Sequence, residues 1–263
     1  MLIILHTHAQ SKRLDALFRI LLFFYPLDKR QKNAYTVRMN TTLTITPIAY
    51  IQTDFPEKFG IPRQSGRATD LTAKIIFLPA FRSPDFFRGI EGFSHLWLLF
   101  DFSATRDKGY SATVRPPRLG GNERVGVFAS RSPFRPNHIG LSCVKLIRVN
   151  VTADEVSLTV SGADLLDGTP ILDVKPYLSF ADCIENATGG YAKAHEHDCL
   201  QVQFPQPLLE KIPQEKRSGL LQCLADDPRP SYQDDERVYG MAFSHFQIKF
   251  TVQGDVLTVI EVV

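Results

Sequence analysis

An unusual concentration of arginine lies between residues 115 and 135, where five guanidinium groups accompany a single acidic residue, Glu123. Guanidinium groups bind phosphate or carboxylate through paired, charge-assisted hydrogen bonds, so this stretch predicts an anionic ligand. Surface charge without a ligand is the alternative. Arg131 is the strongest candidate because it lies one residue beyond an apolar strand and is flanked by serines; Arg118 and Arg135 come next.

A second concentration of reactive side chains lies in the sequence LLDGTPILDVKPYL. Asp167 can cap a turn and Gly168 lets backbone amides approach a ligand, although a purely structural turn would use the same residues. Asp173, Lys175 and Tyr177 follow at alternate positions, so in a strand they would project from one face. An acid, an amine and a phenol side by side are costly unless used or paired, and a plain Asp173–Lys175 salt bridge is the competing interpretation.

Common nucleotide and hydrolase motifs are absent: the chain contains no Walker loop, no nucleophile elbow and no GxGxxG fingerprint. His195, His197 and Cys199 alternate in HEHDC and could meet one metal ion, but we favour a solvated polar loop and predict no metal site. The four cysteines are scattered without a CxxC pair, which argues against a disulfide framework and a zinc ribbon. This cysteine usage favours a reducing cytoplasm.

The composition is that of an ordinary soluble protein of 263 residues, with a formal net charge of +2. Residues 1–38 hold seven Lys and Arg against two Asp, so any basic surface on the remainder must be local. The apolar run at residues 20–27 is much shorter than the roughly 20 residues that a membrane span needs, and no signal-peptide cleavage site follows. We therefore predict no membrane partner, and we expect residues 1–38 to be a dispensable extension or the result of an upstream start, with a partner-binding amphipathic helix as the minor alternative.

Strand patterns dominate the chain up to about residue 185. Segments rich in Val, Ile, Phe and Thr predict strands at residues 43–51, 73–78, 95–102, 124–129, 139–150, 156–160 and 171–174. Helical pattern is scarce there, apart from one short turn at residues 84–89. Strands without intervening helices favour an antiparallel barrel or sandwich over a parallel α/β sheet, and we place this domain at residues 39–185.

A different composition begins near residue 200. A helix is predicted at residues 213–225, with Pro213 in its first turn and Leu220, Leu221 and Leu224 on one side. The final residues alternate around Gly254-Asp255, which indicates a hairpin. These signals predict a small α+β domain at residues 200–263.

Five motifs together resemble one family. They are FGIPRQ, GIEGFSHLWLLF, TVRPPRLGGNERVGVFASRSPFRPNHIGLS, LDGTPILDVKPYL and DDPRPSY. The chain is similar to the TrmO tRNA methyltransferases, also called the TsaA-like family, over residues 45–250. This resemblance implies a β-barrel that binds S-adenosylmethionine, a homodimer, and methylation of N6 of N6-threonylcarbamoyladenosine at position 37 of threonine tRNA.

The resemblance also implies which residues contact the cofactor. Carried onto this sequence, these residues are Pro62, Arg63, Gln64, Ser103, Ala104, Arg131, Leu141, Asp167, Gly168, Thr169 and Pro170. One departure from the family stands in the PNHIG turn, where His138 replaces a proline. That replacement puts the rigidity of this turn in doubt.

Methyl transfer to a nitrogen that is conjugated to a carbonyl needs a group that accepts its proton. The catalytic candidates are Asp173, Lys175 and Tyr177, with Asp173 or Tyr177 as acceptor and Lys175 either lowering the pKa of the phenol or touching the threonyl carboxylate. The predicted RNA contacts are Arg118, Arg135 and Arg229. Two other classes of function stay open: an enzyme that uses S-adenosylmethionine without an RNA acceptor, and a non-catalytic module that senses the cofactor and holds RNA.

Overall fold

The computed structural model describes residues 43–263, apart from residues 117–118, 120–122, 196–197 and 230–236. The expected extension at residues 1–38 lies outside the described residues. Every element described below belongs to one compact unit, Thr46–Val263. None of the helices in the described ranges is long and apolar enough to cross a membrane.

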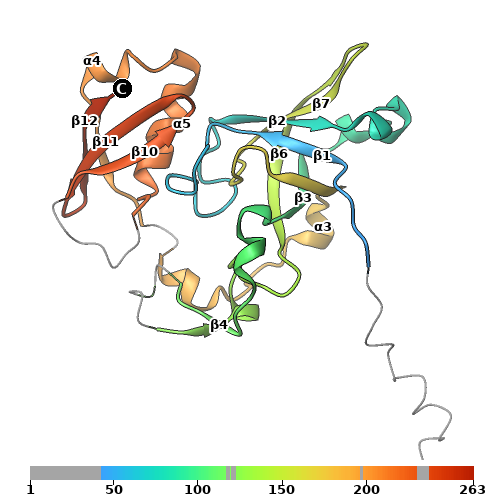
Figure 1. Cartoon of the computed structure of the whole chain (residues 1–263), viewed down its shortest axis with the longest axis horizontal. Helices are drawn as coiled ribbons and strands as arrows, with labels where there is room; N and C mark the ends of the chain where they lie inside the picture. The colour runs from blue at the N-terminus through green and yellow to red at the C-terminus, as the bar shows by residue number, and fades with distance from the viewer. Residues whose placement is uncertain (1–42, 117–118, 120–122, 196–197, 230–236) are drawn as a thin grey trace, which may run out of the picture. The chain divides into compact units, whose positions relative to one another are not determined.

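Six antiparallel strands close into a barrel in the order β1-β2-β7-β6-β3-β8 (Figure 1). The strands are β1 (Ala49–Gln52), β2 (Thr72–Phe77), β3 (His95–Asp101), β6 (Ile139–Val151), β7 (Val156–Ser161) and β8 (Pro170–Pro176). The structure therefore confirms the antiparallel barrel.

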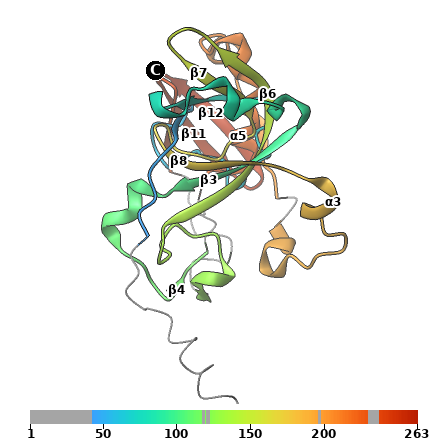
Figure 2. The same cartoon turned by 90° about the vertical axis from the view of Figure 1, so that its right-hand side faces the viewer.

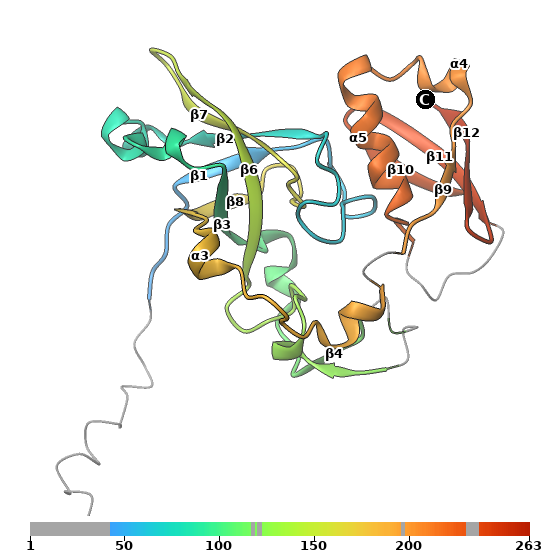
Figure 3. The same cartoon turned by 180° about the vertical axis from the view of Figure 1, so that it is seen from behind.

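The longest barrel strand, β6, pairs with two neighbours in turn. Its first part, from Ile139 to Lys145, pairs with β3, and its second part, from Lys145 to Val151, pairs with β7. The β6–β7 hairpin extends away from the other strands (Figure 3). The first part of β6 also contacts the connection between β1 and β2, where the Cys143 amide donates to Ser65 Oγ at 3.2 Å.

Alternation along the strands builds the barrel core. Leu96, Leu98 and Phe100 of β3 and Val144 of β6 are all at most 5% exposed. Successive side chains of a strand point to opposite faces, so the residues between them form an outer row. That outer row is where functional side chains of β3, β6 and β8 can stand without disturbing the core.

The first expected strand, at residues 43–51, is shorter in the structure and begins at Ala49. Leu43 and Ile45 are 78% and 48% exposed, although their alternation resembles that of a strand. Pro47 has no amide proton to donate, so pairing starts after it, where the Ile48 amide donates to Ile171 O at 2.8 Å.

The expected strand at residues 124–129 is also wrong in its second half. Only β5 (Val125–Gly126) is a strand, paired with β4 (Thr113–Val114), and the 3₁₀ turn η6 (Val127–Ala129) follows. The amide and the hydroxyl of Ser130 both donate to Val127 O, which closes a turn instead of extending the strand. Phe128 is therefore 81% exposed rather than buried.

The C-terminal domain has a four-stranded sheet in the order β10-β11-β12-β9. Its elements are β9 (Gln201–Gln203), α4 (Gln206–Leu209), α5 (Gln214–Ala225), β10 (Tyr239–Phe243), β11 (Phe246–Gln253) and β12 (Val256–Val262). The predicted helix and hairpin are confirmed, the hairpin turning at Gly254 with φ 57°. Pro213 is the N-cap of α5 rather than part of its first turn. The barrel and this sheet appear from a second direction in Figure 2.

Residues of the connection between β1 and β2 pack in the core formed by the C-terminal sheet and α5, and not in the barrel core. Phe55, Ala68 and Leu71 of this connection are buried with Leu220 of α5. Gly219 permits the approach, because a Cβ at this position would overlap the Leu71 side chain. The segment that contains residues 62–64 is therefore attached to the core of the C-terminal sheet.

Gly140→Ala is expected to lower the free energy of unfolding by about 1–3 kcal/mol, the usual cost of overpacking a core. A Cβ at Gly140 would overlap the Phe100 ring, which fills the barrel beside it. Chemical denaturation measures the difference. Gly126→Ala is the matched control, because its φ is −59° and its Cβ would meet open space. Equal stabilities of the two variants would contradict the assigned packing.

Candidate functional site

A cavity of about 1550 Å³ lies where the β1–β2 connection, the η6 segment and residues 187–193 come together. Its described lining contains one acidic side chain, Asp226, and six basic ones. The basic residues are Lys58, Arg63, Arg67, Arg115, Arg131 and Lys193. This excess of positive charge favours an anionic ligand.

Arg131 extends into this cavity from the loop after η6. Its Nη1 donates to Gln64 Oε1 at 2.5 Å, although 67 residues separate the two in sequence. The loop is shaped from within, since the Ser132 amide donates to Ser130 Oγ at 3.3 Å and Arg135 Nη1 donates to Ser130 O at 3.1 Å. Two predicted cofactor residues, Gln64 and Arg131, are thus brought into contact.

Close to Arg131 lies a carboxylate that the sequence motifs did not reveal. Asp164 Oδ1 accepts a hydrogen bond from the Ser142 hydroxyl. Burial raises the pKa of Asp164, whereas hydrogen bonds from Ser142 and the Ser65 amide and the charge of Arg131 act in the opposite direction. The available signal was an acid within the otherwise small and apolar sequence SGADLL.

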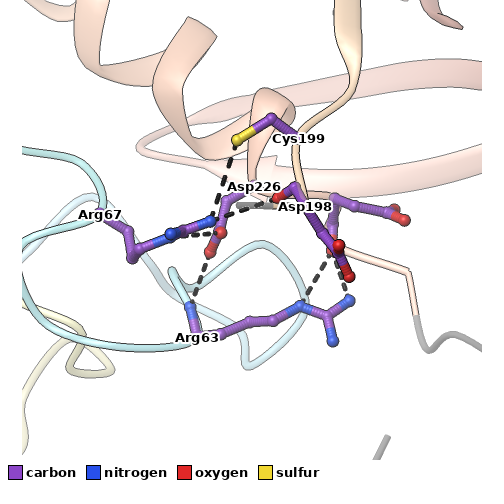
Figure 4. A network of polar contacts seen from close by, with 6 residues as sticks. Arg63, Arg67, Asp198, Cys199 and Asp226 are labelled. Carbon is purple, nitrogen blue, oxygen red and sulfur yellow. Dashed lines mark hydrogen bonds and ion pairs between the residues drawn. The ribbon is translucent and has the colours of Figure 1, made fainter. Parts of the chain in front are cut away.

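The 62–64 segment is fixed by polar contacts to the end of α5 (Figure 4). The Arg63 amide donates to Asp226 Oδ2 at 3.1 Å, and Arg67 Nε donates to Asp226 Oδ1 at 2.8 Å. Arg63 Nη2 donates to Asp227 O at 2.6 Å and also to Arg229 O. The Arg63 guanidinium, predicted as a cofactor contact, lines the cavity while bound to these carbonyls.

The predicted 167–170 turn forms at the end of the barrel. Asp167 Oδ1 accepts the Thr53 amide at 2.9 Å, and the Gly168 amide donates to Ile51 O at 2.9 Å. Gly168 has φ 73°, which glycine adopts without strain. Thr169 Oγ1 donates to Leu166 O at 2.7 Å. Neither this turn nor Pro62 belongs to the cavity lining.

The other predicted cofactor residues lie around β3 and β6. Ser103 and Ala104 are exposed at the start of the 3₁₀ segment η4 (Ser103–Lys108), which an ion pair between Arg106 and buried Asp101 attaches to β3. Leu141 is 52% exposed on the outer face of β6. These three residues also lie outside the cavity lining.

The strand register brings Leu141 and Asp173 to opposite sides of one outer residue. Leu99 of β3 pairs with Leu141 of β6 and with Asp173 of β8. Asp173 Oδ2 and Lys175 Nζ are 2.6 Å apart, so the salt bridge weighed from the sequence is present. Neither residue lines the cavity.

Tyr177 lies just beyond β8 and packs on Trp97, with ring centroids 5.7 Å apart. Burial raises its pKa, and the neighbouring Cys183, Cys143 and Asp182 act in the same direction. Lys175, which was expected to lower the pKa of this phenol, is not among the groups that act on it. A phenol with a raised pKa stays protonated at neutral pH and is a poor proton acceptor.

His138, the departure from the family pattern, adopts φ 49°. Proline cannot adopt this angle because its ring fixes φ near −65°. The His138 ring is nearly buried, and its Nδ1 lies 3.1 Å from Pro133 O. A carbonyl only accepts, so Nδ1 carries the proton and the ring holds this turn by a hydrogen bond.

The predicted RNA contacts differ in their surroundings. Arg118 lies outside the described residues, and Arg135 supports the loop of Arg131 as described above. Arg229 is only 7% exposed, with Nε 3.0 Å from Asp227 Oδ1 and its guanidinium 5.8 Å from the Tyr239 ring centroid. A buried guanidinium held by a carboxylate is poorly placed to meet phosphate directly.

Metal ligands do not assemble in the described part of the chain, where no three His, Cys, Asp or Glu side chains group together. The HEHDC stretch is only partly covered, because His197 lies outside the described residues. All four cysteines are free thiols.

Both domains match known family models. Residues 50–183 match the tRNA-methyltransferase O N-terminal domain, and residues 197–263 match the TrmO C-terminal domain. A tRNA (adenine(37)-N6)-methyltransferase of Escherichia coli (strain K12) is 40% identical over 214 residues, which are 78% of this chain and 91% of that protein.

Two Pseudomonas aeruginosa proteins are also similar. One, named as a candidate S-adenosylmethionine-dependent methyltransferase, is 41% identical over 219 residues, 76% of this chain and 88% of its own length. The crystal structure of TrmO from the same species matches with a TM-score of 0.68 and 33% identity, over 85% of this chain and 100% of that one. The chain therefore belongs to the tRNA-methyltransferase O family.

Proposed function

We propose that this protein transfers a methyl group from S-adenosylmethionine to N6 of the adenosine at position 37 of tRNA. The observation that carries the proposal is the pairing of Arg131 with Gln64 in a basic cavity of a chain whose two domains both match the TrmO family. The relatives named above supply the reaction class.

The donor set around the cavity fits S-adenosylmethionine. The volume accommodates a nucleoside with a methionyl arm, and the Arg131 guanidinium would hold the methionyl carboxylate through two hydrogen bonds. When bound, this group supplies an electrophilic methyl carbon on a sulfonium. The residues assigned from the family motifs, including Pro62, the Ser103–Ala104 pair and the 167–170 turn, remain proposed contacts.

The acceptor is proposed to enter beside Phe128. This ring is 81% exposed and shares the cavity lining with Arg115, Lys58 and Lys193, a combination suited to a splayed base whose phosphates need cations. We further propose that the base is N6-threonylcarbamoyladenosine of threonine tRNA. Its threonyl carboxylate matches the basic lining.

Phe128→Ala is expected to weaken tRNA binding about tenfold, because a stacked base loses its aromatic platform. Affinity for S-adenosylmethionine should not change. Filter binding of tRNA measures the effect, and Phe128→Tyr should retain affinity. Phe86→Ala is the matched control, since Phe86 is 63% exposed and lies outside the cavity. If both alanine variants bind tRNA like the wild type, the acceptor does not stack there.

Proton transfer is proposed to use Asp173. The sulfonium of S-adenosylmethionine would supply the methyl group, and the N6 proton would pass through water to the Asp173 carboxylate, because Asp173 lies outside the cavity lining. Lys175, paired with Asp173, would orient this carboxylate or approach the threonyl group. The raised pKa of Tyr177 favours Asp173 over the phenol.

A homodimer acting in the cytoplasm is part of the same proposal. Phe180 in α3 (Ser179–Asp182) and Ile184 just after it are 86% and 74% exposed and offer apolar surface to a second copy. Free thiols suit a reducing compartment. We also propose that residues 39–185 form the cofactor domain and residues 200–263 the smaller domain, with residues 1–38 dispensable.

The test is methyl transfer from labelled S-adenosylmethionine to threonine tRNA, with and without the threonylcarbamoyl group. Label should appear only in the modified tRNA. Cofactor cleavage without any RNA would identify the first alternative class. Cofactor and tRNA binding without transfer would identify a sensor, and either result would reject the proposal.

A further inference from the structure

The end of α5 carries an acidic side chain that is almost completely buried. Asp226 is 4% exposed, directly follows Ala225 as the C-cap of the helix, and uses both carboxylate oxygens. Oδ2 accepts the Arg63 amide at 3.1 Å, and Oδ1 accepts Arg67 Nε at 2.8 Å (Figure 4). Both partners belong to the β1–β2 connection, more than 150 residues earlier in the chain.

An acid is unfavourable at this position unless it has partners. The C-terminal end of a helix carries partial negative charge, so a carboxylate there is repelled, and burial adds the cost of desolvation. The guanidinium of Arg67 and the amide of Arg63 offset these costs. The helix end therefore specifies where the backbone at residue 63 must lie.

In a second set of contacts, a side chain of the β1–β2 connection binds the backbone that follows α5. The Arg63 guanidinium donates to Asp227 O and to Arg229 O. Asp227 has φ 50°, a strained conformation for a non-glycine residue, and its carboxylate accepts the Arg229 amide at 3.2 Å. The 226–229 turn and the 63–67 segment thus fix one another from both sides.

The residue next to Arg63 is Gln64, whose Oε1 accepts Arg131 Nη1. Asp226, Arg63, Gln64 and Arg131 all line the same cavity. A shift of the backbone at residue 63 would move the Gln64 amide away from the guanidinium that is proposed to hold the cofactor.

We infer that Asp226 is a positioning residue, through which the C-terminal domain sets the geometry of the cofactor wall formed by Gln64 and Arg131. The inference rests on the proposed function. Asp226 acts through the Arg63 amide and does not itself touch the reacting atoms. The C-terminal domain then contributes to cofactor affinity in addition to any contact with tRNA.

The test compares Asp226→Ala and Asp226→Asn with the wild type in the full chain. Asp226→Ala should raise the dissociation constant for S-adenosylmethionine on the order of tenfold, because the wall is no longer preorganised. KM for the cofactor should rise with it, while kcat at saturating cofactor and tRNA affinity stay unchanged. Asp226→Asn, which keeps an acceptor for the Arg63 amide, should restore part of the affinity.

Hydrogen exchange gives a readout that needs neither activity nor ligand. Without cofactor, exchange at the Arg63 amide should become faster in Asp226→Ala while exchange in the β3 ladder does not. Asp70→Asn is the matched control, because the Asp70 carboxylate accepts the Ser218 hydroxyl and so also ties this connection to α5. That variant should lower thermal stability without changing cofactor affinity.

The outcomes separate the two proposals. Wild-type protein that does not bind S-adenosylmethionine would reject the proposed function. Wild-type binding together with unchanged affinity in a folded Asp226→Ala variant would overturn the positioning role alone. An equal loss of affinity in Asp70→Asn would also overturn it, because general loosening of the connection would then explain the effect.

Discussion

Replacement of Arg131 by alanine is expected to raise the dissociation constant for S-adenosylmethionine about 100-fold, or about 2.7 kcal/mol, the range for hydrogen bonds to a charged group. The guanidinium stands exposed in the cavity, and its hydrogen bond to Gln64 leaves other donors for a carboxylate. Calorimetric titration with S-adenosylmethionine measures the change.

Two further variants make the Arg131 result specific. Arg131→Lys keeps the charge and loses the planar pair of donors, so it should recover only part of the affinity. Arg124→Ala is the control, because Arg124 is an exposed arginine of the same region that donates to Thr113 Oγ1 at 2.8 Å and does not line the cavity. Unchanged cofactor affinity in Arg131→Ala would mean that the cofactor binds elsewhere.

Asp173→Asn is expected to lower kcat for methyl transfer about 100-fold, which is typical of losing a general base. Cofactor and tRNA affinities should remain. The fold should also remain, because Asp173 and Lys175 form a partly exposed pair, and such pairs contribute under about 1 kcal/mol to stability. Single-turnover kinetics with bound cofactor and modified tRNA separates the chemical step from binding.

Tyr177→Phe is the discriminating comparison for Asp173. The pKa of this phenol is raised by burial, so the protonated form is retained at neutral pH and its removal should change kcat little. A large loss of kcat in Tyr177→Phe with normal turnover in Asp173→Asn would reverse the assignment of the proton acceptor.

The sequence pattern was sufficient to predict the elements whose structure depends on residues that are close in sequence. The alternation in residues 95–102 and around Gly254 produced strands and a hairpin, because side-chain direction and turn geometry are local properties. The same reasoning was wrong at residues 43–48 and 127–129. Alternation continues there, but Pro47 lacks a donor and Ser130 closes a turn, so strand pairing fails.

The motifs also indicated the positions of the candidate site residues, but they did not indicate the role of each residue. Arg63, Arg131 and Arg229 have the same side chain and stand in similar Pro-rich motifs. In the structure Arg63 binds backbone carbonyls and Arg131 stands exposed in the cavity, whereas Arg229 is buried against Asp227. These differences arise from partners that are distant in sequence, and no local pattern specifies them.

By itself, the sequence determined most of the barrel strands, the α5 helix, the family and the residues that form the basic segments, because these depend on residue type and on short-range spacing. Only the tertiary structure decided that β6 changes partner along its length and that Phe55, Ala68 and Leu71 of the β1–β2 connection pack in the C-terminal core. It also placed Asp226, which belongs to the DDPRPSY motif but was not among the predicted site residues, against the segment beside Gln64. Such placements come from packing and from the pairing of buried charges between distant segments, which composition and periodicity do not encode.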